Sequence, residues 1–116
     1  MTRRRVTLRR LRELAEAGTP LVMVTAYDYA SGRVAERAGV DIVLVGDSGA
    51  QVVLGPPDTT SVTLDEMLTL SKAVRRALQT PLLLCDLPFG STELSDEQAV
   101  ATSIRFVHEA GAEAVK

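Results

Sequence analysis

Acidic, hydroxyl and basic residues directly follow three short apolar runs of the chain. They are Asp47 and Ser48 after 42–45, Asp86 after 82–85, and Lys116 at the end of 113–116. Such runs are typical of buried strands in a parallel sheet, whose carboxyl ends all emerge at one face. Because neighbouring strands lie ~4.8 Å apart, side chains at these ends can converge on one point.

The residue types at this point favour metal-assisted chemistry. Two carboxylates that lie close together repel each other unless a cation sits between them. Hard oxygen ligands suit Mg²⁺, which typically takes one or two carboxylates and fills its other positions with water and substrate oxygens. We therefore predict Asp47 and Asp86 as metal ligands and Lys116 as a positive charge for an anionic substrate. The alternative for each acid alone is a loop or capping residue.

The elements that must position these residues alternate between helix and strand. We expect helices over 8–17, 30–38, 64–78 and 96–110, and strands near 21–25, 42–46, 82–86 and 113–116. Thr7, Thr63 and Ser95 are predicted helix caps, with Glu66 completing a capping box. Repeated units of this kind build a parallel sheet with helices packed outside it, so the fold class is α/β. We find no linker that divides the chain.

Helical spacing also predicts which side chains face inward. In the first helix the expected buried stripe is Leu8, Leu11, Leu14 and Ala15. In the second helix Val34 and Ala38 are expected to face inward. Asp28, which follows the first strand, is either an outer partner of the metal site or the cap of the following helix, and we favour the cap.

Composition restricts the class of protein. The chain has 116 residues, of which 46% are hydrophobic, 24% charged and 3% aromatic, with a net charge of -2. This balance argues against a protein-wide nucleic-acid surface, and no segment has the ~18 apolar residues of a membrane span. The single cysteine, Cys85, cannot form an internal disulfide, which fits a cytoplasmic location.

The first twelve residues nevertheless hold six of the thirteen basic residues. We interpret them as the polar face of the first helix, and the alternative is a nucleic-acid or phosphate-binding patch.

Two other residues with reactive side chains, Ser48 and Cys85, are not predicted to act as nucleophiles. Gly46-Asp-Ser-Gly49 is similar to a serine-protease nucleophile stretch, but that chemistry needs a histidine beside the serine, and His108 is expected in mid-helix. Cys85 lies within a predicted buried strand, which favours packing over nucleophilic catalysis.

Several short motifs, in order along nearly the whole chain, resemble the ketopantoate hydroxymethyltransferase family. They are Thr25-Ala-Tyr-Asp-Tyr29, Val45-Gly-Asp-Ser48, Val53-Leu-Gly55 with Asp58-Thr59, Asp86-Leu-Pro-Phe89 and Ala110-Gly-Ala-Glu-Ala-Val-Lys116. The resemblance implies a (β/α)₈ barrel of the phosphoenolpyruvate mutase and isocitrate lyase group. Since such a barrel takes ~250 residues, we expect residues 1–116 to form a single partial domain, the amino-terminal half of the barrel, led by a helix within 1–18.

The resemblance also implies an activity, a site and partners. The family transfers a hydroxymethyl group from 5,10-methylenetetrahydrofolate to 3-methyl-2-oxobutanoate, giving 2-dehydropantoate for pantothenate synthesis. By resemblance, Asp47 and Asp86 bind Mg²⁺, and Asp47, Ser48, Asp86 and Lys116 line the ketoacid site. The expected partners are these two small molecules and further copies of the chain, with no nucleic acid or membrane.

Departures from the family pattern accompany the resemblance. Gly49-Ala50-Gln51 and Pro56-Pro57 differ from the usual residues, and the expected general base and a third metal-site acid would lie beyond Lys116. Three alternatives remain: a phosphomutase or lyase for another 2-oxo acid, a truncated remnant without activity, and a phosphoacceptor signalling module. The last also has strand-end acids, but it places its acid pair after the first strand.

Overall fold

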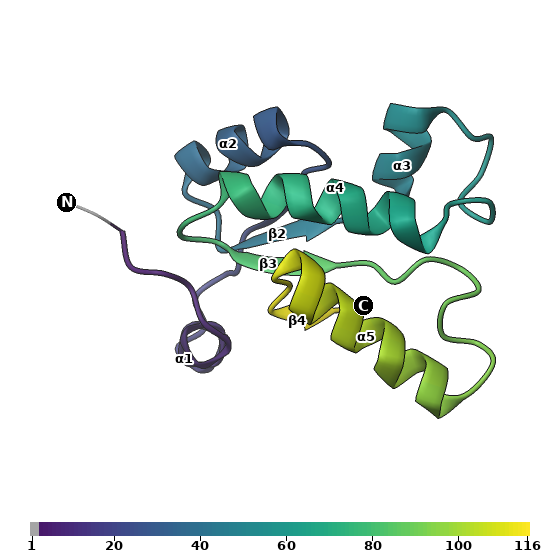
Figure 1. Ribbon diagram of the computed structural model, residues 1–116. Coiled ribbons are helices and arrows are strands. Elements are labelled where there is room, and N and C mark those ends of the chain that lie inside the picture. The colour runs from purple at the N-terminus through teal and green to yellow at the C-terminus, as the bar shows by residue number, and fades with distance from the viewer. Residues whose placement is uncertain (1–2) are drawn as a thin grey trace.

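The computed structural model describes residues 3–116, in which strands and helices alternate after a leading helix, except that two helices lie between the second and third strands (Figure 1). The elements are α1 (Leu8–Glu16), β1 (Met23–Thr25), α2 (Tyr29–Ala38), β2 (Ile42–Val45), α3 (Asp47–Leu54), α4 (Leu64–Ala77), β3 (Leu82–Cys85), α5 (Asp96–Ala110) and β4 (Ala114–Val115). The predicted strands are all present, each one to two residues shorter than expected at one or both ends.

The four strands form one parallel sheet in the order β1-β2-β3-β4. The central register pairs Val43 with Leu83 and Val45 with Cys85. Sequential order without a reversal is the order of strands around a (β/α)₈ barrel. A phosphoacceptor domain of the doubly wound type has a strand order of 2-1-3-4-5, so the sheet contradicts that alternative.

Helices α2, α4 and α5 lie along one face of the sheet, with α4 between the other two (Figure 1). The side chains on this face are fully buried, including Val43 and Val45 of β2 and Leu83 and Cys85 of β3. Ile42, Leu44 and Leu84 alternate with them and are only half-buried. On this second face Leu82, at 2% exposed, is the one fully buried residue of β2 and β3 within residues 3–116, so the sheet is covered mainly on the helix face.

The predicted helix ends are confirmed. The Thr7, Thr63 and Ser95 side chains each accept a hydrogen bond from the backbone N–H three residues later. Glu66 closes the capping box of α4 by accepting from the N–H of Thr63 at 2.9 Å. These caps satisfy N–H groups that have no partner within the helix.

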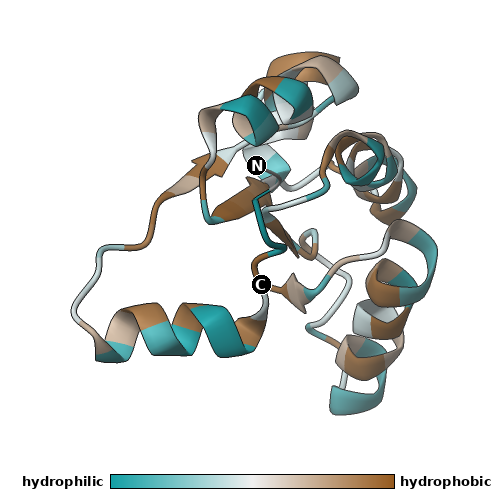
Figure 2. Cartoon of the chain, turned by 90° about the vertical axis from the view of Figure 1, so that its left-hand side faces the viewer, coloured by the Kyte–Doolittle hydropathy of each residue, from teal (hydrophilic) through white to brown (hydrophobic). Residues whose placement is uncertain are grey.

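The inward face predicted for α2 is wrong, and the stripe predicted for α1 is half-buried only at Leu11 and Leu14. In α2, Gly32 and Ala35 face α4, whereas Val34 is 69% exposed and Ala38 is exposed too. The reason is close helix packing: a Cβ on Gly32 would lie only 2.7 Å from the Cβ of Ala77, so only small residues fit there. None of the stripe predicted for α1 is fully buried, because α1 stands apart from the sheet (Figure 2).

Helix α3, between β2 and α4, is not among the helices predicted from the sequence. It begins at Asp47 and ends at Gly55, whose φ of 84° is the left-handed conformation that glycine adopts readily. Asp47 and Ser48 therefore lie in the first turn of a helix.

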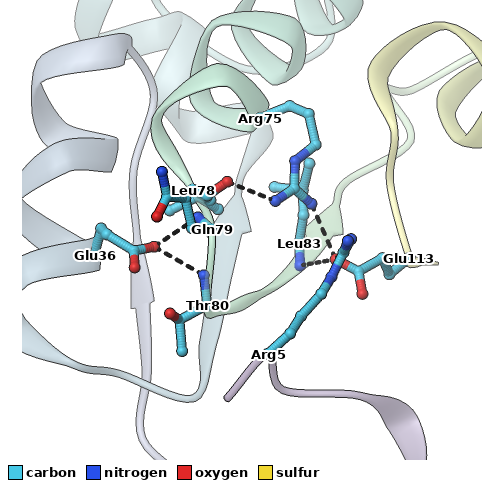
Figure 3. Close-up of polar contacts among 8 residues, drawn as sticks. All are labelled: Arg5, Glu36, Arg75, Leu78, Gln79, Thr80, Leu83 and Glu113. Atoms are coloured by element: carbon cyan, nitrogen blue, oxygen red, sulfur yellow. Dashed lines mark hydrogen bonds and ion pairs between the residues drawn. The ribbon is translucent and has the colours of Figure 1, made fainter. Parts of the chain in front are cut away.

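Two carboxylates fasten the opposite, amino-terminal end of the sheet (Figure 3). Glu36 of α2 accepts hydrogen bonds from the N–H groups of Gln79 at 2.8 Å and Thr80 at 3.1 Å. Glu113, before β4, lies between Arg75 at 2.9 Å and Arg5 at 3.1 Å. These contacts tie the start of β3 and β4 to the helices and to the segment that precedes α1.

Within residues 3–116, no helix combines the length and the apolar character needed to cross a bilayer.

Candidate functional site

Asp86 is the centre of a polar cluster at the carboxyl end of the sheet. It is 7% exposed and has two partners from neighbouring strands. Its Oδ2 accepts a hydrogen bond from the backbone N–H of Asp47 at 3.1 Å. Its Oδ1 accepts from Nζ of Lys116 at 2.9 Å. The structure thus brings together the ends of β2, β3 and β4, as the parallel arrangement predicts.

The parallel ladder fixes these positions through backbone bonds that continue past the strands. The N–H of Asp86 donates to the carbonyl of Val45 at 2.9 Å, and the N–H of Lys116 donates to that of Cys85 at 2.9 Å. The N–H of Leu87 then donates to the carbonyl of Lys116 at 2.7 Å. The two charged residues are consequently held at the sheet edge by main-chain geometry.

Gly46 makes room beside the Asp86 carboxylate. An added Cβ at this glycine would lie 3.5 Å from both Oδ2 of Asp86 and Oγ of Ser48. The φ of Gly46 is -82°, so the backbone itself does not require glycine. The space beside Gly46 therefore has a carboxylate oxygen and a hydroxyl on its border.

The charge of Lys116 is reinforced by its neighbours. The hydrogen bond to Asp86, followed by the negative charges of Asp86 and Asp47, raises the pKa of the Lys116 ammonium. Its side chain is nevertheless 66% exposed, so it stays accessible to an anion. The Lys116 ammonium therefore has a carboxylate partner in Asp86 and an open side toward solvent.

The Asp47 carboxylate has no hydrogen bond or ion pair from any side chain or backbone group in residues 3–116. Asp47 is half-buried, and Ser48, which follows it in α3, is exposed. An unpaired carboxylate near a second one is free to take a ligand. The roles of Asp47 and Ser48 stay predictions.

The oxygen atoms present fit an incomplete magnesium shell. Across residues 3–116 there is no group of three or more His, Cys, Asp or Glu side chains that could hold a metal ion. Asp47, Asp86 and Ser48 offer two carboxylates and a hydroxyl at the carboxyl end of the sheet. Mg²⁺ usually takes only one or two carboxylates from a protein and fills its other positions with water and substrate oxygens.

The other reactive residues lie outside this cluster. Asp28 caps α2, and hydrogen bonds from the Ser31 side chain and backbone lower the pKa of its carboxyl. His108 is exposed on α5. Burial raises the pKa of the Cys85 thiol to about 11, so the thiol is protonated and unreactive near neutral pH. Asp28 and Cys85 have the structural roles favoured from the sequence, whereas His108 lies in the last turn of α5 and not in mid-helix as predicted.

One functional group was missed by the sequence reading: the backbone N–H of Asp47, which holds Asp86. The signal that could have found it is the acid in a helix's first turn directly after a glycine, a common helix start. The first N–H groups of a helix such as α3 have no acceptor carbonyl within the helix, so they must find other partners.

Comparison with known proteins identifies relatives along the whole described chain. The model of the family described as ketopantoate hydroxymethyltransferase matches residues 5–116. The 3-methyl-2-oxobutanoate hydroxymethyltransferase of Acidothermus cellulolyticus is 50% identical over 97% of this chain and 42% of its own length. An Arabidopsis thaliana relative, named 3-methyl-2-oxobutanoate hydroxymethyltransferase 1, mitochondrial, is 48% identical over 97% of this chain.

Solved structures show the same fold. A phosphoenolpyruvate phosphomutase from Streptomyces platensis subsp. rosaceus superposes with a TM-score of 0.74 at 24% identity, covering 90% of this chain and 35% of that one. A 2,3-dimethylmalate lyase of the PEP mutase/isocitrate lyase superfamily gives 0.69 at 21% identity, covering 90% of this chain and 37% of that one. The chain spans less than half the length of these relatives, so its sheet corresponds to part of their fold.

Proposed function

Because the chain belongs to the ketopantoate hydroxymethyltransferase family, we propose that it supplies the metal- and ketoacid-binding part of such an enzyme. The reaction transfers a hydroxymethyl group from 5,10-methylenetetrahydrofolate to 3-methyl-2-oxobutanoate and yields 2-dehydropantoate. The observation that carries the proposal is the cluster of Asp86, Lys116 and the Asp47 N–H at the carboxyl end of the sheet. In barrels of this type, chemistry takes place at that end.

We assign the metal to Asp47 and Asp86, with Mg²⁺ as the ion. When bound, it would supply Lewis-acid stabilisation of the negative charge that develops on the keto oxygen of a 2-oxo acid. A 2-oxo acid offers two oxygens, one keto and one carboxylate, for positions that protein ligands leave open. Because residues 3–116 would provide only two carboxylates as ligands, coordination positions of the ion stay open for these oxygens.

Lys116 orients the substrate in this proposal. Its accessible ammonium can bind the ketoacid carboxylate while its bond to Asp86 keeps it at the edge of the sheet. The Ser48 hydroxyl adds a hydrogen-bond donor beside the same space.

Proton removal from carbon 3 is assigned to a group outside this cluster, because no further acid or histidine joins it within residues 3–116. Homo-oligomeric assembly and a cytoplasmic location are part of the same proposal. The phosphomutase and lyase alternative has weaker support, since those proteins share the fold at 21–24% identity, against 50% for the hydroxymethyltransferase relative.

The experiment measures two properties of the purified full chain. Saturation-transfer NMR reports whether 3-methyl-2-oxobutanoate binds, with and without Mg²⁺, and NMR in deuterium oxide reports exchange of its carbon-3 proton. We expect Mg²⁺-dependent binding that is lost in Asp86→Asn and kept in Asp65→Asn, whose side chain is 87% exposed. Binding without exchange would agree with a base outside this cluster, as proposed. Absence of Mg²⁺-dependent binding would contradict the assignment.

A further inference from the structure

A second polar hollow lies at the other end of the sheet from Asp86. It is formed by the segment before α1, by α1 itself and by the residue that precedes β2, and its volume is about 770 Å³. Its charged lining consists of Arg3, Arg4, Arg5, Arg9, Arg10, Glu13 and Asp41. Five guanidinium groups against two carboxylates leave three positive charges in excess. A concave site of this size is within the usual range for small-molecule binding.

The segment that carries three of these arginines is anchored to the sheet. The N–H of Val6 donates to the carbonyl of Thr80 at 2.8 Å, and the Val6 side chain is 4% exposed. Arg3 donates to the carbonyl of Gly39 and to Asp41 at 3.1 Å. Arg5 pairs with Glu113 (Figure 3). The arginines are therefore presented from a fixed backbone.

The remaining arginines differ in what they already bind. Arg9 and Arg10 share one carboxylate, Glu13, at 3.0 and 3.7 Å. Arg4 is exposed and has no ion pair within residues 3–116. Exposed ion pairs such as these are worth little, so an anion with several charges can displace Glu13 at small cost.

We propose that this hollow binds a small polyphosphate anion, such as a di- or triphosphate group. Guanidinium groups bind phosphate oxygens in a bidentate manner, and arginines spread across one hollow favour several linked phosphates over a single one. The excess charge is local, since the whole chain carries a net charge of -2, which disfavours an extended nucleic acid. The inference does not depend on the proposed function, because the two sites lie at opposite ends of the strands.

The test titrates tripolyphosphate into the full chain by calorimetry in magnesium-free buffer. We expect wild type to bind tripolyphosphate at least tenfold more tightly than orthophosphate. The Arg4→Gln variant should bind severalfold more weakly, and Glu13→Gln should bind more tightly because it removes the competing carboxylate. Arg37→Gln, which removes an exposed arginine on α2 outside the hollow, is the matched control and should bind like wild type.

A parallel titration with a nucleoside triphosphate tells whether the group is bound free or as part of a nucleotide, and binding of either supports the proposal. Equal weakening by Arg4→Gln and Arg37→Gln would overturn it, as would unchanged affinity in Glu13→Gln. Duplex DNA that binds more tightly and is not displaced by tripolyphosphate would also overturn it. Circular dichroism spectra confirm that each variant is folded.

Discussion

The backbone N–H of Asp47 donates a hydrogen bond to Oδ2 of Asp86 across 3.1 Å, and this bond joins the end of β2 to the end of β3. It leaves the Asp47 side chain unpaired within residues 3–116, while Asp86 is held on both oxygens. The two acids thus have different parts in the same cluster. Asp86 is oriented by these two bonds and keeps a further lone pair on each oxygen, and Asp47 is a carboxylate without a partner among the described residues.

The first prediction concerns the cost of losing Asp86. Asp86→Ala leaves the N–H of Asp47 without its acceptor in a mostly buried place, so we expect a loss of about 1–3 kcal/mol in the free energy of unfolding. Asp86→Asn keeps an amide oxygen for that N–H and should lose less. Urea denaturation measures both, with Asp65→Ala as the exposed control. Equal losses for Asp86→Ala and Asp65→Ala would contradict the role of the Asp47 N–H.

The second prediction concerns the contact between α2 and α4. Alanine usually stabilises a helix interior by about 1 kcal/mol relative to glycine. We expect the opposite for Gly32→Ala, because the new Cβ would lie 2.7 Å from that of Ala77 and overpacking costs about 1–3 kcal/mol. Thermal denaturation of the single and double variants measures the effect. Combining Gly32→Ala with Ala77→Gly should recover stability, and strictly additive losses would disprove the contact.

The third prediction concerns pH and Glu36. Burial by itself raises the pKa of Glu36. The hydrogen bonds from the N–H groups of Gln79 and Thr80 together lower this pKa by more than burial raises it, so the net shift is downward. A carboxyl whose pKa is lowered by folding stabilises the fold at pH values above its pKa in the unfolded chain, which is near 4.5 for Glu36. This stabilisation is lost as the pH falls through the pKa of the folded state. Glu36→Gln should therefore lower the melting temperature at pH 7.

The melting temperatures of the same two proteins should draw together as pH falls below 4.5 and wild-type Glu36 becomes protonated in the folded state. A difference that stays constant from pH 7 to pH 3 would show that the Glu36 charge is not the cause. The control is Glu97→Gln at the start of α5, which is exposed and accepts no hydrogen bond from another element among residues 3–116.

Local sequence signals predicted much of this fold because they act over three or four residues. Thr63 with Glu66, and Ser95 before α5, set helix starts through bonds that depend only on spacing. The convergence of Asp86 with Lys116 followed from parallel strands having their carboxyl ends together. Such rules need no knowledge of the remaining packing.

The predictions of buried helix faces failed where contacts between distant segments determine which side chains are buried. Val34 was expected inside because it is large and apolar, yet Gly32 and Ala35 face α4, since close approach of two helices requires small side chains. The apolar stripe of α1 was expected to be buried, but whether a helix has a partner surface is a property of distant segments. Periodicity indicates which residues share a face, and it does not indicate what covers that face.

Asp47 and Asp86 sharing one magnesium ion is the claim on which the proposed function depends, and calorimetric titration of Mg²⁺ in the presence of saturating 3-methyl-2-oxobutanoate tests it most directly. We expect one ion per full chain in the wild type. Asp47→Asn and Asp86→Asn should each weaken binding at least tenfold, and Asp65→Asn should leave it unchanged. Wild-type affinity in both Asp47→Asn and Asp86→Asn would contradict the account.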